Sequence, residues 1–262
     1  MKAIIIWLII LVSLPAMAVD NSNVRKLNLN TDGIETFKIY CGAGFLKIQG
    51  DENLDEIQVN ADIVGKNGNE KEIRQYLDEY LKLELTREGS QAILRSEINS
   101  DGHSFFSTIL DKYPDIEVNL TVKVPAALKL YVDDGSGYIE INNMNSYVEI
   151  DDGSGDLVVR GVGGDLLIDD GSGDLEIDDV SGNVDIDDGS GHVKIKNVRG
   201  NVTLDDGSGN VNISQIGGSV RVDDGSGSIT IDGVEKDVII DDSGSGGLDI
   251  TNVAGRIQRN DD

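Results

Sequence analysis

Apolar residues recur two positions apart through the second half of the chain. Leu175 and Ile177 form one such pair, and Val184 and Ile186 form the next. Strict alternation with polar residues, dominated by β-branched Val and Ile, is typical of a short strand with one buried face. The pattern therefore predicts a series of short β-strands that share one core.

The predicted strands belong to a repeat of 18 residues. The string Asp-Asp-Gly-Ser-Gly begins at Asp133 and returns every 18 residues as far as Asp223, and a longer variant, Asp-Asp-Ser-Gly-Ser-Gly, begins at Asp241. Counted from the first aspartate of each string, apolar residues occupy positions 7, 9, 12, 16 and 18, and glycine is usual at position 14. Each repeat is thus two strands of about four or five residues joined by glycine-containing corners.

One repeat cannot bury its own apolar face, so neighbouring repeats must stack. An unbroken period lets equal positions lie above one another, which separate β-hairpins would not require. The sequence predicts an all-β fold, a parallel two-sheet β-solenoid with 18-residue coils. Positions 7 and 9 are expected to face positions 16 and 18 across the core, with position 12 filling one corner.

The region before the repeats is predicted to be an irregular β region with one capping helix. Alternation predicts strands at 26–29, 37–40, 45–48, 57–63 and 116–124. A helix over about 69–83 is indicated by a capping box, Asn69 with Glu72, and by one apolar face. We expect it to cover the open end of the solenoid. The predicted divisions are a signal peptide at 1–18, the N-terminal region at 19–125, the solenoid at 126–258 and a polar tail at 259–262.

The first 18 residues have the pattern of a secretory signal peptide. Lys2 precedes an apolar run from Ala3 to Leu14, and Ala16-Met17-Ala18 forms the cleavage site. The run has about twelve residues, whereas a spanning helix needs about twenty. The sequence therefore predicts export to the periplasm, the cell surface or the medium, with no integral membrane span after cleavage.

The charge and the counts of histidine and cysteine argue against nucleic acid as a partner and against two kinds of site. Against 48 Asp and Glu stand 22 Lys and Arg, a formal charge of −26. Binding of nucleic acid is not expected, because phosphates are held by basic residues. Two histidines and a single cysteine, Cys41, do not supply a His-rich or Cys-rich zinc site or a disulfide within the chain.

The acidic corners are the candidate chemical site. Stacked coils would place like charges about 5 Å apart, and this repulsion must be compensated. In one interpretation, each carboxylate accepts hydrogen bonds from the following Gly and Ser N–H groups, as in an Asx-turn. In the other, the carboxylates bind Ca²⁺, which prefers oxygen ligands; no other cofactor is predicted. The candidate metal ligands are Asp133, Asp134, Asp151, Asp152, Asp169, Asp170, Asp187, Asp188, Asp205, Asp206, Asp223, Asp224, Asp241 and Asp242.

Other residues give no sign of catalysis. The repeated corner serines lack a nucleophile elbow and a histidine for each, so they are interpreted as a structural column. Cys41 is interpreted as a small buried hydrophobe. Aromatic residues make up 5% of the chain, which does not favour a stacking platform for sugars. The sequence predicts no enzyme and no catalytic residue.

The tandem Asp-Asp-Gly-Ser-Gly coils follow a signal peptide and a strand-rich segment that ends in Val124-Pro125. In these features the chain resembles a bacterial putative-adhesin family of exported β-solenoids, a domain of unknown function. The resemblance covers Val118 to about Ile257. It implies a non-enzymatic adhesin or structural scaffold at the cell envelope, with an envelope protein or a polysaccharide as partner. The alternative is an exported repeat module that binds calcium and is stabilised by it.

Overall fold

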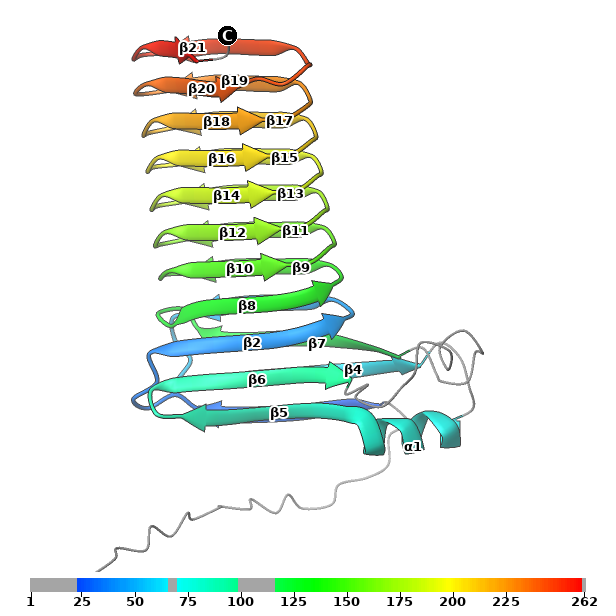
Figure 1. The fold of residues 1–262 in the computed structure, drawn as a ribbon. Helices are drawn as coiled ribbons and strands as arrows, with labels where there is room; N and C mark the ends of the chain where they lie inside the picture. Colours follow the sequence, from blue (N-terminus) through cyan, green and yellow to red (C-terminus); the bar gives the residue numbers. More distant parts are fainter. Residues whose placement is uncertain (1–22, 66–69, 99–115, 261–262) are drawn as a thin grey trace, which may run out of the picture.

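The computed structural model describes residues 23–65, 70–98 and 116–260. The predicted signal peptide, and Asn69 of the predicted capping box, lie outside these residues. Within them, the fold is two eleven-stranded sheets that face each other along a rod (Figure 1). The prediction of an all-β, parallel two-sheet β-solenoid is confirmed.

The regular part of the rod alternates between the two sheets. One sheet, here called sheet A, takes the strands β9 (Ile139–Met144), β11 (Leu157–Val162), β13 (Leu175–Val180), β15 (Val193–Val198), β17 (Val211–Ile216), β19 (Ile229–Val234) and β21 (Leu248–Val253). The other, sheet B, takes β8 (Lys129–Ser136), β10 (Val148–Asp152), β12 (Leu166–Asp170), β14 (Val184–Asp188), β16 (Val202–Asp206), β18 (Val220–Asp224), β20 (Val238–Asp242) and β22 (Ile257–Arg259).

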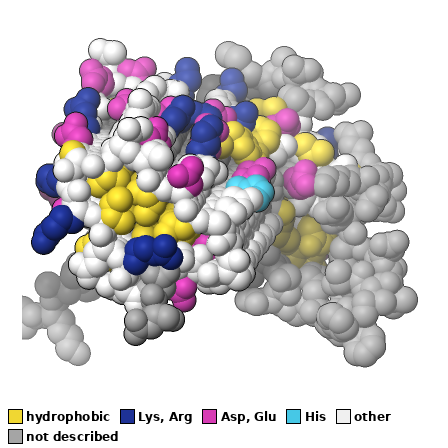
Figure 2. Space-filling model, turned by 90° about the horizontal axis from the view of Figure 1, so that it is seen from above, with side chains coloured by type: hydrophobic (Ala, Val, Ile, Leu, Met, Phe, Trp, Pro, Cys, Tyr) yellow, Lys and Arg dark blue, Asp and Glu magenta, His cyan; other side chains and the backbone are white. Residues whose placement is uncertain are grey.

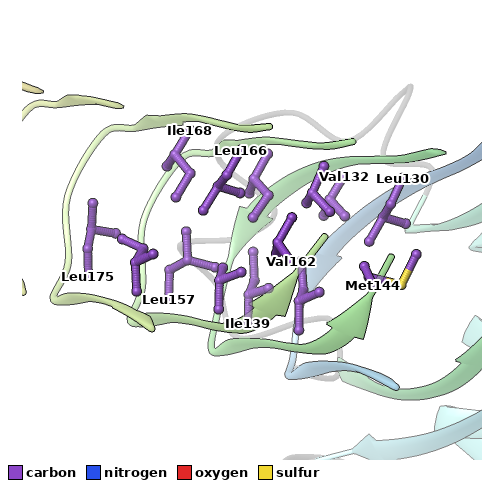
Figure 3. Close-up of a cluster of buried hydrophobic side chains, with 14 of the residues drawn as sticks. Leu130, Val132, Ile139, Met144, Leu157, Val162, Leu166, Ile168 and Leu175 are labelled. Carbon is purple, nitrogen blue, oxygen red and sulfur yellow. The ribbon is translucent and has the colours of Figure 1, made fainter. Parts of the chain in front are cut away.

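Parallel pairing keeps the 18-residue register. Val148 pairs with Leu166, and Leu166 pairs with Val184. The aliphatic residues at positions 7, 9, 12, 16 and 18 meet between the sheets, as Figure 3 shows for Leu130, Ile139, Leu157 and their neighbours. Nearly all of them are at most 3% exposed from β8 to β20. The predicted core ladder is therefore confirmed.

The N-terminal region adds strands to the lower end of both sheets. In sheet A these are β1 (Val24–Asn30), β4 (Glu56–Gly65), β7 (Ile116–Pro125) and β3 (Leu46–Asp51). In sheet B they are β5 (Leu81–Glu88), β6 (Gln91–Ile98) and β2 (Thr36–Ala43). Strands β5 and β6 were not among the predicted strands. Their side chains do not alternate cleanly, since three consecutive apolar residues, Ala92, Ile93 and Leu94, are buried.

The predicted helix is α1, and it is shorter than the interval 69–83. It spans Glu70–Tyr80, and the chain enters β5 at Leu81. The prediction was wrong at this end because Leu81 and Leu83 also fit a strand with one apolar face. Leu77 is buried in the core and Ile73 packs against it, so the helix covers part of the lower end of the rod. In the described part of the chain, no helix is long and apolar enough to cross a membrane.

The upper end of the rod is less well covered. Leu248, Ile250 and Val253 of β21 are half-buried, and Ile257 is 51% exposed. Figure 2 looks down on this end and shows hydrophobic side chains together, with Lys and Arg side chains beside them. Beyond β21 and β22, no further strand pairs with either edge among the described residues.

Candidate functional site

The two aspartates of each corner have opposite environments. Each Asp-Asp-Gly-Ser-Gly string starts at the end of a sheet B strand, so the strand alternation continues through it. The first aspartate, here called outer, is exposed; the outer aspartates are Asp133, Asp151, Asp169, Asp187, Asp205 and Asp223. The second is at most 4% exposed and lies in one file through six coils, here called the inner aspartate column; its members are Asp134, Asp152, Asp170, Asp188, Asp206 and Asp224.

In five of the six coils, one oxygen of the inner carboxylate accepts a hydrogen bond within its own corner. The backbone N–H of Ser172 donates to Asp170 Oδ1 at 3.1 Å, and that of Ser208 donates to Asp206 Oδ1 at 2.9 Å. Ser154, Ser190 and Ser226 donate in the same way to their own coils' aspartates, at 2.9 to 3.3 Å. The Asx-turn interpretation is thus confirmed for the inner aspartates of these five coils.

The other oxygen of each inner carboxylate has no partner. Oδ2 of all six inner aspartates is buried and receives no hydrogen bond. An ionised carboxylate oxygen can only accept, so it needs an N–H, O–H or cation that these sites do not provide. A buried polar atom without a partner costs free energy, and more so when it carries charge.

Burial raises the pKa of every inner carboxyl above its ordinary value. The pKa rises to about 7 for Asp152 and Asp188, and to about 6 for Asp134 and Asp206. The largest cause is loss of hydration, and for Asp152 and Asp188 the aspartates in the coils above and below add repulsion. The pKa values of Asp170 and Asp224 are raised by the same burial.

The column is followed at its lower end by neutral groups. Below Asp134, β2 places Cys41 in register, and β6 places the buried Ser96 in register with Cys41. Cys41 and Asp134 are close enough that the carboxylate helps to raise the pKa of the thiol. Cys41 is half-buried and occupies an aspartate position of the column, so it is not the fully buried hydrophobe that the sequence predicted. Burial raises the pKa of its thiol, which opposes the reactive thiolate form.

The last corner leaves the column because of its extra residue. The register shifts after Val222, so that Asp242 pairs with the outer Asp223. Asp242 is exposed, Asp241 is half-buried and the following Ser243 is buried. The inserted residue thus brings a hydroxyl, in place of a seventh carboxylate, to the inner side of the chain.

One further corner of the same kind lies at the lower end of the column, and it was not predicted from the sequence. Tyr40-Cys41-Gly42-Ala43-Gly44 lies in register with Asp133 to Gly137 and links β2 to β3. Gly44 has a φ of 134° and Gly137 a φ of 140°, so the two corners share one backbone conformation. The shared pattern of glycine, small residue and glycine was the available signal. It is weak without the aspartates.

In the corner on the opposite edge of the rod, one residue of each coil has a left-handed backbone conformation. Asn143, Asp179, Asn197, Gln215 and Asn252 have φ between 54° and 59°, and Gly161 and Gly233 take the equivalent place. All stand at position 11 of their coils, apart from the one-residue shift in the last. Asn, Asp and Gly tolerate this conformation better than other residues.

Polar ladders also connect successive coils at the two corners. The carboxylate or amide oxygen at position 15 accepts from the backbone N–H one coil later, from Asp165 to Asn183, then Asn201, then Ser219, at 2.7 to 3.0 Å. A second ladder at position 6 includes His192, whose Nδ1 accepts from the N–H of Asn210 at 3.3 Å. These side chains therefore have a structural role, because they hydrogen-bond one coil to the next.

The fourteen predicted metal ligands do not come together around one point. Among residues 23–65, 70–98 and 116–260, there is no group of three or more His, Cys, Asp or Glu that could hold a metal ion. The corner contributes one inner and one outer carboxylate per coil, on opposite sides of the strand. Calcium binding by these residues stays a prediction.

A tyrosine cluster lies on the outward face of sheet B, near the lower end of the rod. We define it as Tyr40, Tyr131 and Tyr147 with Lys38 and Arg95. The rings of Tyr131 and Tyr147 are 5.7 Å apart, Lys38 Nζ lies 5.5 Å from the centre of the Tyr131 ring, and the Arg95 guanidinium lies 4.3 Å from that of Tyr40. These are favourable cation–π distances.

The tyrosine cluster borders a shallow hollow lined by Lys38, Tyr40, Tyr131 and Glu149. The Tyr147 hydroxyl donates to Glu149 Oε2 at 2.6 Å, and burial together with this bond raises the pKa of Tyr147. Sequence reasoning missed the cluster because Tyr40 and Tyr131 are 91 residues apart. Only the insertion of β2 beside β8 brings them together.

The coils, the two facing sheets and the repeated corner define the chain as a parallel β-solenoid. Residues 46–258 match the model of the Toastrack DUF4097 family, and the chain belongs to that family. The match begins earlier than the predicted resemblance, at the start of β3. No curated protein matches the sequence.

Several solved structures are remotely similar. A protein from Parabacteroides distasonis described as a putative lipid binding protein has 15% identity and a TM-score of 0.44, with 92% of this chain and 96% of that one covered. A putative adhesin from Parabacteroides merdae has 10% identity and a TM-score of 0.39, covering 91% and 97%. A putative cell adhesion protein from Clostridium sporogenes has 12% identity and a TM-score of 0.38, covering 91% and 99%.

Proposed function

We propose that the chain is a non-enzymatic scaffold of the bacterial cell envelope that adheres to a partner through the outward faces of its sheets. Export by the predicted signal peptide is part of this proposal. The observation that supports it most is the contrast between the residue types at the inward and the outward positions of the coils. Inward positions of the coils from β9 to β20 hold aliphatic residues, Met144, Ser243 and most of the aspartate column. Outward position 17 of sheet B holds Tyr131, Glu149, Leu167, Asp185, Thr203, Arg221 and Ile239.

A varied outward face suits a partner with an irregular surface. A repeating lattice would be matched by identical side chains at equal spacing. The rod provides the rigidity, because each coil is held to the next by parallel strand pairing, a close-packed core and the polar ladders. A rigid surface loses little conformational entropy when it binds.

Sheet A is the less suitable contact face, because its outward charges already pair with one another. Glu176 bonds to Arg160 at 3.0 Å and to Lys194 at 3.2 Å, and Asp178 bonds to Lys196 at 3.0 Å. On sheet B, the tyrosine cluster combines aromatic area with cations and carboxylates. Tyrosine and arginine are enriched among residues that dominate binding energy. We therefore propose the tyrosine cluster as the principal contact, with an envelope protein or polysaccharide as partner.

Replacing two tyrosines tests this role. We expect Tyr131→Ala with Tyr147→Ala to weaken binding of the purified protein to isolated cell-envelope material by about tenfold or more, as for central interface aromatics. The measurement is a sedimentation or surface-binding isotherm, run on untreated, protease-treated and glycosidase-treated envelope. Loss of binding after one treatment identifies the partner as protein or polysaccharide.

The matched control is Leu167→Ala with Ile239→Ala. These residues occupy the outward position of sheet B that Tyr131 holds, in coils farther from the tyrosine cluster. Equal binding by the two double variants would reject the tyrosine cluster as the contact. Failure of the native protein to bind any envelope preparation would reject the adhesive function itself.

A further inference from the structure

The unpartnered Oδ2 atoms of the inner aspartate column require a ligand. Six carboxyl groups are at most 4% exposed, and each leaves one buried oxygen without a hydrogen bond. Their strands pair in parallel, so neighbouring carboxyls are stacked about 5 Å apart. Six adjacent buried anions would repel one another and would lack the hydration that stabilises a free carboxylate.

Two kinds of ligand could neutralise the column, namely a metal ion and a proton. A calcium ion takes six to eight oxygens, whereas each coil contributes one inner carboxylate, and three acidic groups do not converge at any point in the described residues. The backbone groups of the corner are already used, since Gly171 donates to the carbonyl of Asp152 and Gly189 to that of Asp170. A proton needs no such shell, because it turns Oδ2 into an O–H donor beside the next carboxyl.

We propose that the inner aspartate column is a proton-binding site, in which stacked carboxyl groups hold and share protons at mildly acidic to neutral pH and so stabilise the rod. The protons come from water, and each binding event neutralises one carboxylate without any other change in bonding. Neighbouring groups titrate as a coupled set, as do paired carboxyls that share a proton. The proposal is independent of the adhesive function.

The groups around the column reinforce this behaviour. The nearest titratable neighbours are mostly acids: Asp156 and the outer aspartates along the strands, and Asp242 above Asp224. His192 near Asp206 acts in the opposite sense and lowers the pKa of the Asp206 carboxyl. Cys41, in register below Asp134, lowers the pKa of the Asp134 carboxyl. The surroundings therefore favour the protonated form along the middle of the column.

The direction of the pH effect follows from the raised pKa values. A carboxyl that titrates near 4 in the unfolded chain and at about 6 to 7 in the folded one binds its proton more tightly when folded. Its stabilising contribution is complete below about pH 4 and is lost as pH rises through about 7. We expect the urea midpoint of the native protein, followed by circular dichroism, to be about 1 M higher at pH 5 than at pH 8.

An isosteric variant separates the column from the general charge of the protein. Asp188→Asn keeps an oxygen for the Ser190 N–H and replaces Oδ2 with a neutral N–H donor. We expect it to raise the urea midpoint at pH 8, to change it little at pH 5, and to reduce the pH dependence. The control, Asp187→Asn, removes the same charge from the exposed neighbour and should change the pH dependence much less.

Three results would overturn the proposal. The first is a native midpoint that does not fall between pH 5 and pH 8. The second is an equal response of Asp188→Asn and Asp187→Asn. The third is a rise of the pH 8 midpoint on adding Ca²⁺ to chelator-treated protein that is as large as the rise on acidification, because it would make the column a cation site.

Discussion

Replacing Gly173 with alanine is expected to destabilise the rod by more than about 4 kcal/mol, or to prevent folding. Gly173 has a φ of 150°, and a Cβ there would overlap the carbonyl oxygen of Gly155 in the coil below. The overlapping atom is backbone, and that backbone is held by the stacked corners on either side. Neither the strand spacing nor the side-chain rotamers can relieve the clash.

Gly89→Ala is the matched control. Gly89 also has a positive φ, 64°, but no atom lies within 4 Å of its added Cβ. We expect it to cost about 1 to 2 kcal/mol, the backbone penalty alone. Urea unfolding followed by circular dichroism gives both values. Equal costs for the two variants would show that coil-to-coil contact does not determine the corner.

Truncating a buried isoleucine in the middle of the rod is expected to have the next largest effect. Ile195 is fully buried in β15, with coils above and below it. Ile195→Ala removes aliphatic contacts from both sheets and should cost about 3 to 4 kcal/mol. Because each coil is stabilised by its neighbours, a weak central coil also lowers the cooperativity of the rod.

Leu167→Ala provides the comparison for the core. Leu167 is 37% exposed on the outward face of sheet B, so its loss should cost less than about 1 kcal/mol. The two free energies come from the same denaturant titration. A cost for Ile195→Ala as small as that for Leu167→Ala would contradict a close-packed core between the sheets.

The 18-residue repeat made the solenoid predictable from the sequence. The burial of the second aspartate of each corner was not predicted, although the same alternation indicates it. Ile168 and Asp170 are two residues apart in one strand, so alternation alone places both inside. The sequence interpretation treated the two aspartates of each corner alike, because buried carboxylates are rare and costly. Their burial differs because the strand continues through Asp170, which turns the second aspartate inward.

The N-terminal region was harder to predict because its neighbours are distant in sequence. Strand β2 pairs with β8 and β6, and β3 lies between β7 and β9. Neither the Cys41 corner nor the tyrosine cluster can be predicted from the sequence without knowing that strand order. Alternation predicted strands such as β7 correctly, but short apolar segments carry no information about which strand lies beside them.

The protonation state of the inner carboxyls tests the central claim most directly. The measurement is a carbon-detected NMR titration of the side-chain carboxyl groups in protein labelled at aspartate, from pH 3 to pH 9, with Asp188→Asn and Asp187→Asn for assignment. The proposal predicts a distinct set of aspartates, including Asp188, that titrates near pH 6 to 7. Titration of every aspartate below about pH 5 would contradict it.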